Sequence, residues 1–167
     1  PTFRDVKHNY IHIHAAIAII WVLLIIVQPF LIVNKKFSWH RKLGKLSYLI
    51  FPLLILSFIP MVLNNLNSDT PENAFFPIGD GTLLVLFYSL AIYNRKKTAL
   101  HMRYMIAAAL VLFGPTVGRI LPNLLGFGAI ATQNIQFTII QSILIALVLF
   151  DKTNNRKYFP YLLSITG

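Results

Sequence analysis

The five histidines have the most distinctive chemistry in this chain, and they form two groups along the sequence. His8, His12 and His14 stand together at the start of the first apolar segment, whereas His40 and His101 each stand just before a later one. Imidazole binds haem iron, zinc and copper. Two such side chains from facing helices could supply both axial ligands of a b-type haem, and His40 with His101 is the candidate pair. The alternative is that both are solvated histidines at helix ends.

Polar side chains inside apolar segments form a second candidate site. At 1.5 Å per helical residue, Arg119 lies about 27 Å from His101, near the opposite membrane surface. Asp80 is expected at the same level, so we predict an Asp80–Arg119 ion pair, joined by His12 or His14. The alternative is that Arg119 reaches the lipid headgroups and Asp80 lies in a loop.

The last apolar segment adds four polar residues at roughly helical spacing: Asn134, Thr138, Gln141 and Ser142. Such a stripe normally faces other helices, where it finds hydrogen-bond partners. It predicts interhelical hydrogen bonds or, as an alternative, one wall of a transport path. Together with the preceding residues it defines an outer polar cluster, which comprises His12, His14, Asp80, Arg119, Asn134, Thr138 and Gln141.

Composition decides which elements can position these residues. The chain has 167 residues, of which 56% are apolar and 12% are charged. Soluble domains carry about a quarter charged residues, and a single core of this length cannot bury so many apolar side chains. A soluble monomer and a disordered chain are both excluded. The sequence contains no Cys, which excludes disulfides, Cys-based zinc or iron–sulfur sites and thiol catalysis.

Five apolar segments predict an all-α, polytopic transmembrane helix bundle. A membrane-spanning helix needs about 20 residues, and the segments are continuously apolar rather than alternating as in a barrel strand. We treat residues 1–167 as a single transmembrane domain, with predicted spans at 10–33, 46–63, 74–93, 102–121 and 135–150. Within the fourth span, Gly114 and Gly118 would let another helix approach closely, and Pro115 would kink the helix.

The distribution of charge predicts how the chain threads through the membrane. The net charge is +10, but the basic residues are concentrated in alternate connections, at 35–45, 95–103 and 152–157. The connections at 64–81 and 122–134 contain no Lys or Arg. By the positive-inside rule, the N-terminus is outside and the C-terminus is in the cytoplasm of a bacterial-type inner membrane. The basic excess is thereby explained without nucleic acid as a partner.

Two short motifs carry a resemblance to a known family. The run from Phe37 to Lys45, with His40-Arg41-x-x-Gly44, resembles the start of the second helix in a family of uncharacterised bacterial multi-span membrane proteins, known as a domain of unknown function. The run from His101 to Met105 is similar to that family's His-x-x-aromatic-Met element. Arg119-Ile120 resembles the arginine that closes the following helix, and Ala107 departs from the family pattern, which has Arg there. The resemblance covers Gln28 to Leu121 and implies four or more helices. It also implies that His40, His101 and Arg119 belong to one set of residues. It implies no activity.

We therefore expect a membrane protein that acts as an accessory or structural subunit, with no catalysis of its own. The sequence contains no nucleophile–base pair with an orienting acid, no phosphate-binding loop and no zinc-protease motif. The lipid bilayer is one expected partner, and a membrane-protein partner or a second copy is another. The alternatives are an electron-transfer module with haem b and a small transporter with an outward-facing polar pocket. The residues do not indicate which metal, if any, is bound.

Overall fold

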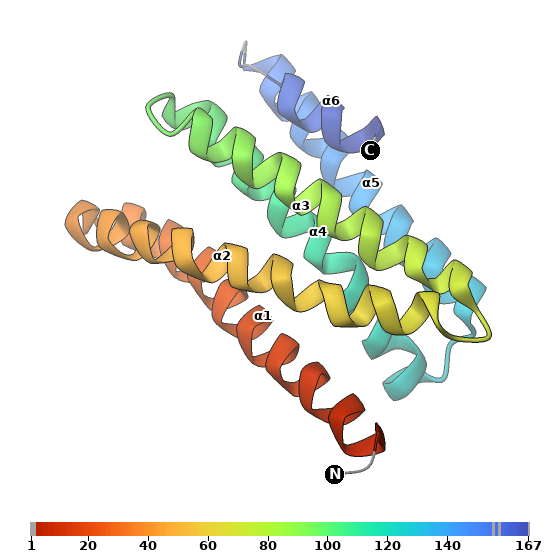
Figure 1. The fold of residues 1–167 in the computed structure, drawn as a ribbon. Helices are drawn as coiled ribbons and strands as arrows, with labels where there is room; N and C mark the ends of the chain where they lie inside the picture. Colours follow the sequence, from red (N-terminus) through yellow and green to blue (C-terminus); the bar gives the residue numbers. More distant parts are fainter. Residues whose placement is uncertain (1–2, 155, 157, 167) are drawn as a thin grey trace. The chain divides into compact units, whose positions relative to one another are not determined.

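The computed structural model describes residues 3–154, 156 and 158–166, except for the side chains of residues 3–9, 119 and 166 (Figure 1). The described part of the chain is almost entirely helical, which confirms the all-α prediction. Its elements are α1 (Phe3–Val33), α2 (Phe37–Leu66), the short 3-10 helix η1 (Pro71–Ala74), α3 (Phe75–Tyr93), α4 (Thr98–Leu125), α5 (Ala129–Thr153) and α6 (Phe159–Thr166).

Within the described residues, five helical segments are long and apolar enough to cross a membrane, as the sequence predicts. They are Tyr10–Val33, Phe37–Leu66, Pro71–Tyr93, Thr98–Leu125 and Ala129–Thr153. α2, α4 and α5 begin before their predicted spans, whereas α3 begins one residue after its own. In α2 this difference brings Arg41, Lys42 and Lys45 onto the helix rather than into a loop. Long basic side chains permit this because their alkyl stems lie along apolar surface while their charges reach water.

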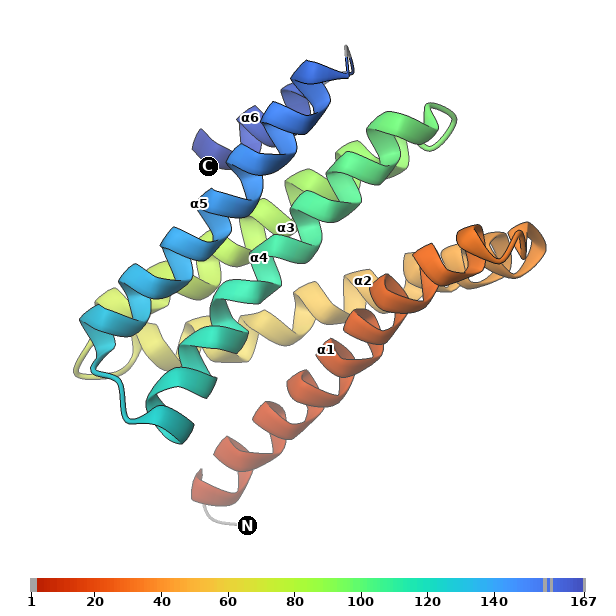
Figure 2. The same cartoon turned by 180° about the vertical axis from the view of Figure 1, so that it is seen from behind.

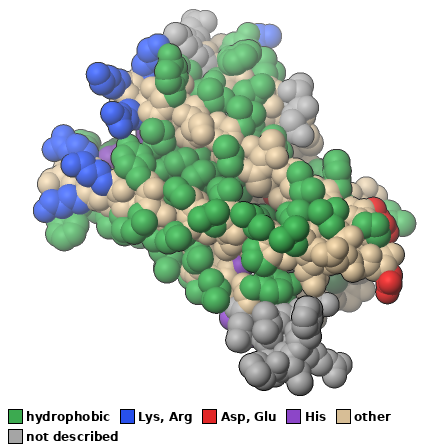
Figure 3. Space-filling view, viewed as in Figure 1, with side chains coloured by type: hydrophobic (Ala, Val, Ile, Leu, Met, Phe, Trp, Pro, Cys, Tyr) green, Lys and Arg blue, Asp and Glu red, His purple; other side chains and the backbone are tan. Residues whose placement is uncertain are grey.

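The chain divides into two compact units, Pro1–Gly81 and Thr82–Gly167, which we describe separately. In the first unit, α1 and α2 form an antiparallel hairpin. Lys35 adopts the left-handed conformation at the turn (φ 57°), and the Lys36 N–H donates to the Leu31 carbonyl (2.8 Å), which closes the end of α1 as a Schellman-type cap. Lys and Arg side chains gather at this turn, whereas hydrophobic side chains cover the length of the hairpin (Figure 3).

The facing surfaces of α1 and α2 follow a heptad repeat. Buried or half-buried residues recur at alternating spacings of three and four, the pattern of a helix pair with a continuous seam. Three contacts mark successive heptads: Gln28 meets Gly44, Trp21 packs on Phe51 with ring centroids 5.1 Å apart, and His14 packs on Phe58. The seam residues are Tyr10, His14, Ile17, Trp21, Leu24, Gln28 and Leu31 of α1, with Gly44, Ser47, Phe51, Leu54, Phe58, Met61 and Asn65 of α2.

In the second unit, α4 contacts both α5 and α6, and α5 contacts α6 (Figure 1, Figure 2). Small buried residues, Ala107 and Ala108, lie in the middle of α4. The predicted small-residue surface is occupied by a side chain of α5: a Cβ added to Gly118 would lie 3.2 Å from the Gln136 Oε1. α4 ends at Gly126, which adopts the left-handed conformation (φ 67°) that favours glycine.

Candidate functional site

A buried ion pair joins the first turns of α4 to the last turn of α5. The Arg103 Nε donates to the Asp151 Oδ2 (2.5 Å), and Nη2 donates to Oδ1 (2.7 Å). A third bond runs from Nη1 to the Ala99 carbonyl, one turn earlier in α4 (2.7 Å). The two side chains are only 2% and 5% exposed. This bidentate geometry satisfies both charges within the protein.

The predicted fourth span, 102–121, contains Arg103, and the structure places Arg103 inside α4. The sequence analysis does not predict its partner, Asp151, which neutralises it. One signal was present: Asp151 is an isolated acid at the end of an apolar segment that is otherwise followed by basic residues.

Tyr161 of α6 lies beside this ion pair and is buried. Burial raises the pKa of the Tyr161 hydroxyl above its usual value, and the Asp151 carboxylate raises it further, while Arg103 opposes the shift. The phenol therefore stays neutral in the folded protein. Arg103, Asp151 and Tyr161 together connect α4, α5 and α6.

His101 is held by a backbone carbonyl of the preceding helix. Its Nδ1 lies 2.9 Å from the Ala91 oxygen of α3. Because a carbonyl can only accept, Nδ1 carries the proton and the neutral ring has its lone pair on Nε2. Histidines that bind metals are commonly oriented in this way, with the second nitrogen donating to a carbonyl. His101 is half-exposed.

His40 has the opposite tautomer. The Gln28 side-chain amide of α1 lies against the start of α2, where its nitrogen donates to the His40 Nδ1 and to the His40 carbonyl, and its oxygen accepts from the Gly44 N–H (2.9 Å). The amide thus bonds to both ends of one turn of α2, which gives the His40-Arg41-x-x-Gly44 motif a structural role. Because Nδ1 accepts, the neutral His40 ring carries its proton on Nε2.

These two tautomers determine how well the histidines fit a haem. His101 presents Nε2 as a ligand, but His40 would have to lose its hydrogen bond with Gln28 or move its proton. The two side chains belong to different units, so each is described within its own unit. The pairing of His40 with His101 at one haem stays a prediction. Among the described residues, no group of three or more His, Asp or Glu side chains could hold a metal ion.

His14 is the buried member of the predicted outer polar cluster. Its Nδ1 lies 2.8 Å from the Ser57 Oγ, and that hydroxyl donates to the Leu54 carbonyl (2.5 Å). The hydroxyl oxygen therefore accepts a hydrogen bond from the His14 Nδ1–H, and the imidazole ring packs edge-on against Phe58. His12, two residues earlier, is exposed. His14 thus contributes to the α1–α2 seam.

The other cluster residues are placed as follows. Asp80 is half-buried in α3, and Arg119 lies in α4 with its side chain outside the described part of the chain. On α5, Asn134 and Thr138 are exposed and Gln141 is half-buried. The cluster residues belong to both units, and each is placed within its own unit.

The polar residues of α5 that face α4 were not predicted. Thr132 is buried, and Gln136 lies over Gly114 and Gly118 of α4. The Thr132 Oγ1 and the Gln136 Oε1 are buried without a hydrogen-bond partner among the described atoms. Their four-residue spacing could have indicated a shared face.

Comparison of the chain with protein-family models, curated proteins and solved structures finds no match.

Proposed function

We propose that this protein is a non-catalytic accessory or structural subunit of a bacterial-type inner membrane. In this proposal five spans cross the bilayer, the N-terminus is outside, and the basic connections lie on the cytoplasmic side. The partner is another membrane protein or a second copy of the chain.

The exposed polar face of α5 carries this proposal. Asn134, Thr138 and Ser142 recur every four residues on exposed positions of one helix, and only 6% of the most apolar stretch of α5 is buried within the chain. In hydrocarbon, polar side chains are stabilised by hydrogen bonds to neighbouring helices. A second membrane-protein surface would supply such partners.

Two buried polar interactions within the chain also support a structural role. The Arg103–Asp151 ion pair and the hydrogen bond between His14 and Ser57 each join two helices of this chain. Both interactions therefore stabilise the packing of helices within this chain, which is a structural role.

The test is co-purification in a mild detergent after cross-linking in the membrane. We expect a stable partner, which Asn134→Leu and Thr138→Val should release. Gln133→Leu is the matched control, because Gln133 is also an exposed amide but points about 100° away around the helix. A lone monodisperse monomer, or equal loss of the partner in all three variants, would overturn the proposal.

Haem binding is a second candidate, favoured by the orientation of His101. The hydrogen bond from Nδ1 to Ala91 leaves Nε2 as the nitrogen that can bind iron. The absorbance spectrum of the purified protein tests this candidate. A Soret band that His101→Ala abolishes, and that Met102→Ala at the next position preserves, would support it; a spectrum without such a band would refute it.

A further inference from the structure

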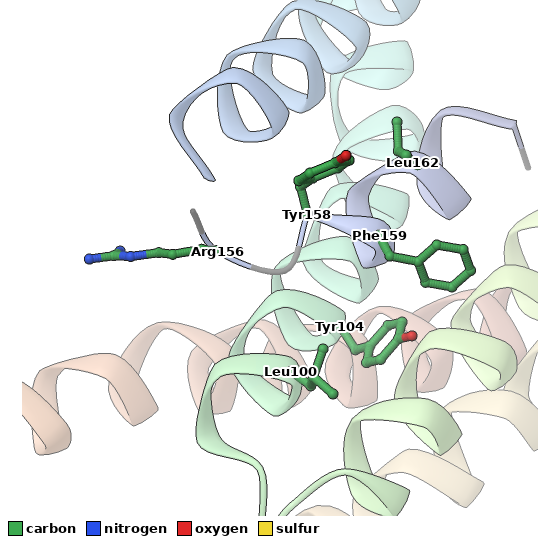
Figure 4. A pocket seen from close by; sticks show the side chains of 6 residues that line it. All are labelled: Leu100, Tyr104, Arg156, Tyr158, Phe159 and Leu162. Carbon is green, nitrogen blue, oxygen red and sulfur yellow. The ribbon is translucent and has the colours of Figure 1, made fainter. Parts of the chain in front are cut away.

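A groove lies between the start of α4 and α6 (Figure 4). Its volume is about 580 Å³. The lining residues are Leu100, Tyr104, Arg156, Tyr158, Phe159 and Leu162. The groove lies entirely within the second unit.

The lining combines an apolar floor with a charged rim. Leu100 and Tyr104 contribute from α4, and Phe159 contributes from α6. Arg156 extends away from these side chains in Figure 4, and its Cζ lies 5.6 Å from the centroid of the Phe150 ring. The guanidinium is thus at the edge of the groove, where it can reach water or a headgroup.

The exposure of α6 presents apolar side chains beside the groove. Phe159 is 64% exposed and Leu162 is 39% exposed, whereas Tyr161 between them is buried. Exposed apolar side chains next to a basic connection are suited to the boundary between headgroups and acyl chains, and Tyr side chains concentrate at that level.

The charge around the groove favours an anionic occupant. Arg103 is neutralised by Asp151, and Arg156 is the cation among the described residues that line the groove. Basic residues beside a membrane segment attract anionic lipid headgroups. An apolar floor below a single cation matches a molecule with an acyl chain and a phosphate.

We propose that this groove binds an anionic phospholipid, with one acyl chain on Tyr104 and Phe159 and the phosphate at Arg156. The site rests on the proposed membrane orientation, which places these residues at the anionic cytoplasmic leaflet. It does not depend on the protein partner proposed for α5.

Native mass spectrometry of the purified full chain tests the proposal. Phosphatidylglycerol and phosphatidylcholine with identical acyl chains are titrated separately, and bound lipid is counted. We expect preferential binding of phosphatidylglycerol, which Arg156→Gln should weaken about fivefold. Lys152→Gln removes the same charge outside the groove and should have little effect, whereas Arg156→Lys should retain most of the preference.

A second variant tests the acyl-chain contact. Phe159→Ala should weaken the binding of both lipids, whereas Phe137→Ala, at an exposed position on α5, should not. Equal binding of the two lipids by the unaltered protein would overturn the proposal, as would equal loss in Arg156→Gln and Lys152→Gln. A dimer that dissociates in Phe159→Ala, without bound lipid, would show that a second copy occupies the groove. A lone monomer with no co-purifying partner, but with the lipid preference intact, would count against the proposed function alone.

Discussion

Removal of either partner of the Arg103–Asp151 pair should be strongly destabilising, and removal of both should not. In Asp151→Leu the buried guanidinium retains one acceptor, the Ala99 carbonyl, and loses two charge-assisted bonds. The side chains are 2% and 5% exposed, so water cannot replace the lost partner. Breaking such a pair costs about 3–5 kcal/mol of the free energy of unfolding.

The double variant Arg103→Leu/Asp151→Leu places two apolar side chains where the ion pair was. Replacement of a buried pair by apolar residues of similar size is often neutral, so most of the stability should return. The coupling energy from the four proteins should then be about 5 kcal/mol or more, because each single variant loses about 3–5 kcal/mol and the double variant loses little. Reversible unfolding of the protein in mixed micelles by titration with dodecyl sulfate, followed by circular dichroism, measures each free energy.

Lys152→Leu is the control for this cycle, because it removes an exposed charge next to Asp151 and should change stability by less than about 0.5 kcal/mol. If the losses in the two single variants simply add in the double variant, within about 0.5 kcal/mol, then the side chains do not interact as described. That result would refute the assignment of Arg103 to the interior of the protein.

Three further predictions concern single positions. His14→Leu should lower the free energy of unfolding by about 1 kcal/mol through loss of a buried hydrogen bond, whereas His12→Leu, at an exposed position, should leave it nearly unchanged in the same titration. Gly118→Ala brings a methyl group to 3.2 Å from a side-chain oxygen of α5, whereas the nearest atom to Gly114→Ala is at 4.0 Å. Gly114→Ala should therefore raise the free energy of unfolding by up to about 1 kcal/mol through helix propensity. Gly118→Ala should raise it less or lower it, and thermal denaturation measures both. Because the pKa of Tyr161 is raised in the folded state, the unfolded chain loses this proton first and stability should fall as the pH rises above about 10; Tyr161→Phe should make that fall shallower, and an unchanged slope would contradict the assignment.

The helix ends show where sequence reasoning is weakest. The predicted second span begins at residue 46, but α2 begins at Phe37. Hydropathy reports where lipid solvates side chains, whereas a helix continues as long as its backbone bonds are satisfied. Arg103 illustrates the consequence, because an arginine within the first turns of a helix looks like a loop charge until Asp151 is found beside it.

The faces of the helices could have been predicted only in part. Most of the residues from 10 to 33 are apolar, so hydrophobicity alone shows no period. The polar or aromatic side chains at His14, Trp21 and Gln28 do recur every seven residues, and this spacing marks the seam with α2. The matching positions on α2, Gly44 and Phe51, have no common chemistry that would have identified them.

The amino-acid sequence by itself determined that the chain is helical and where its five apolar segments lie, because the energy of solvating side chains in lipid depends on composition and length. Tertiary structure alone decided which polar groups meet: Arg103 with Asp151, His101 with a carbonyl of α3, and Gln28 with His40. Those pairings depend on distances between helices, and a continuous apolar run leaves rotation of each helix about its own axis undetermined. The tautomers of His101 and His40 follow from these contacts.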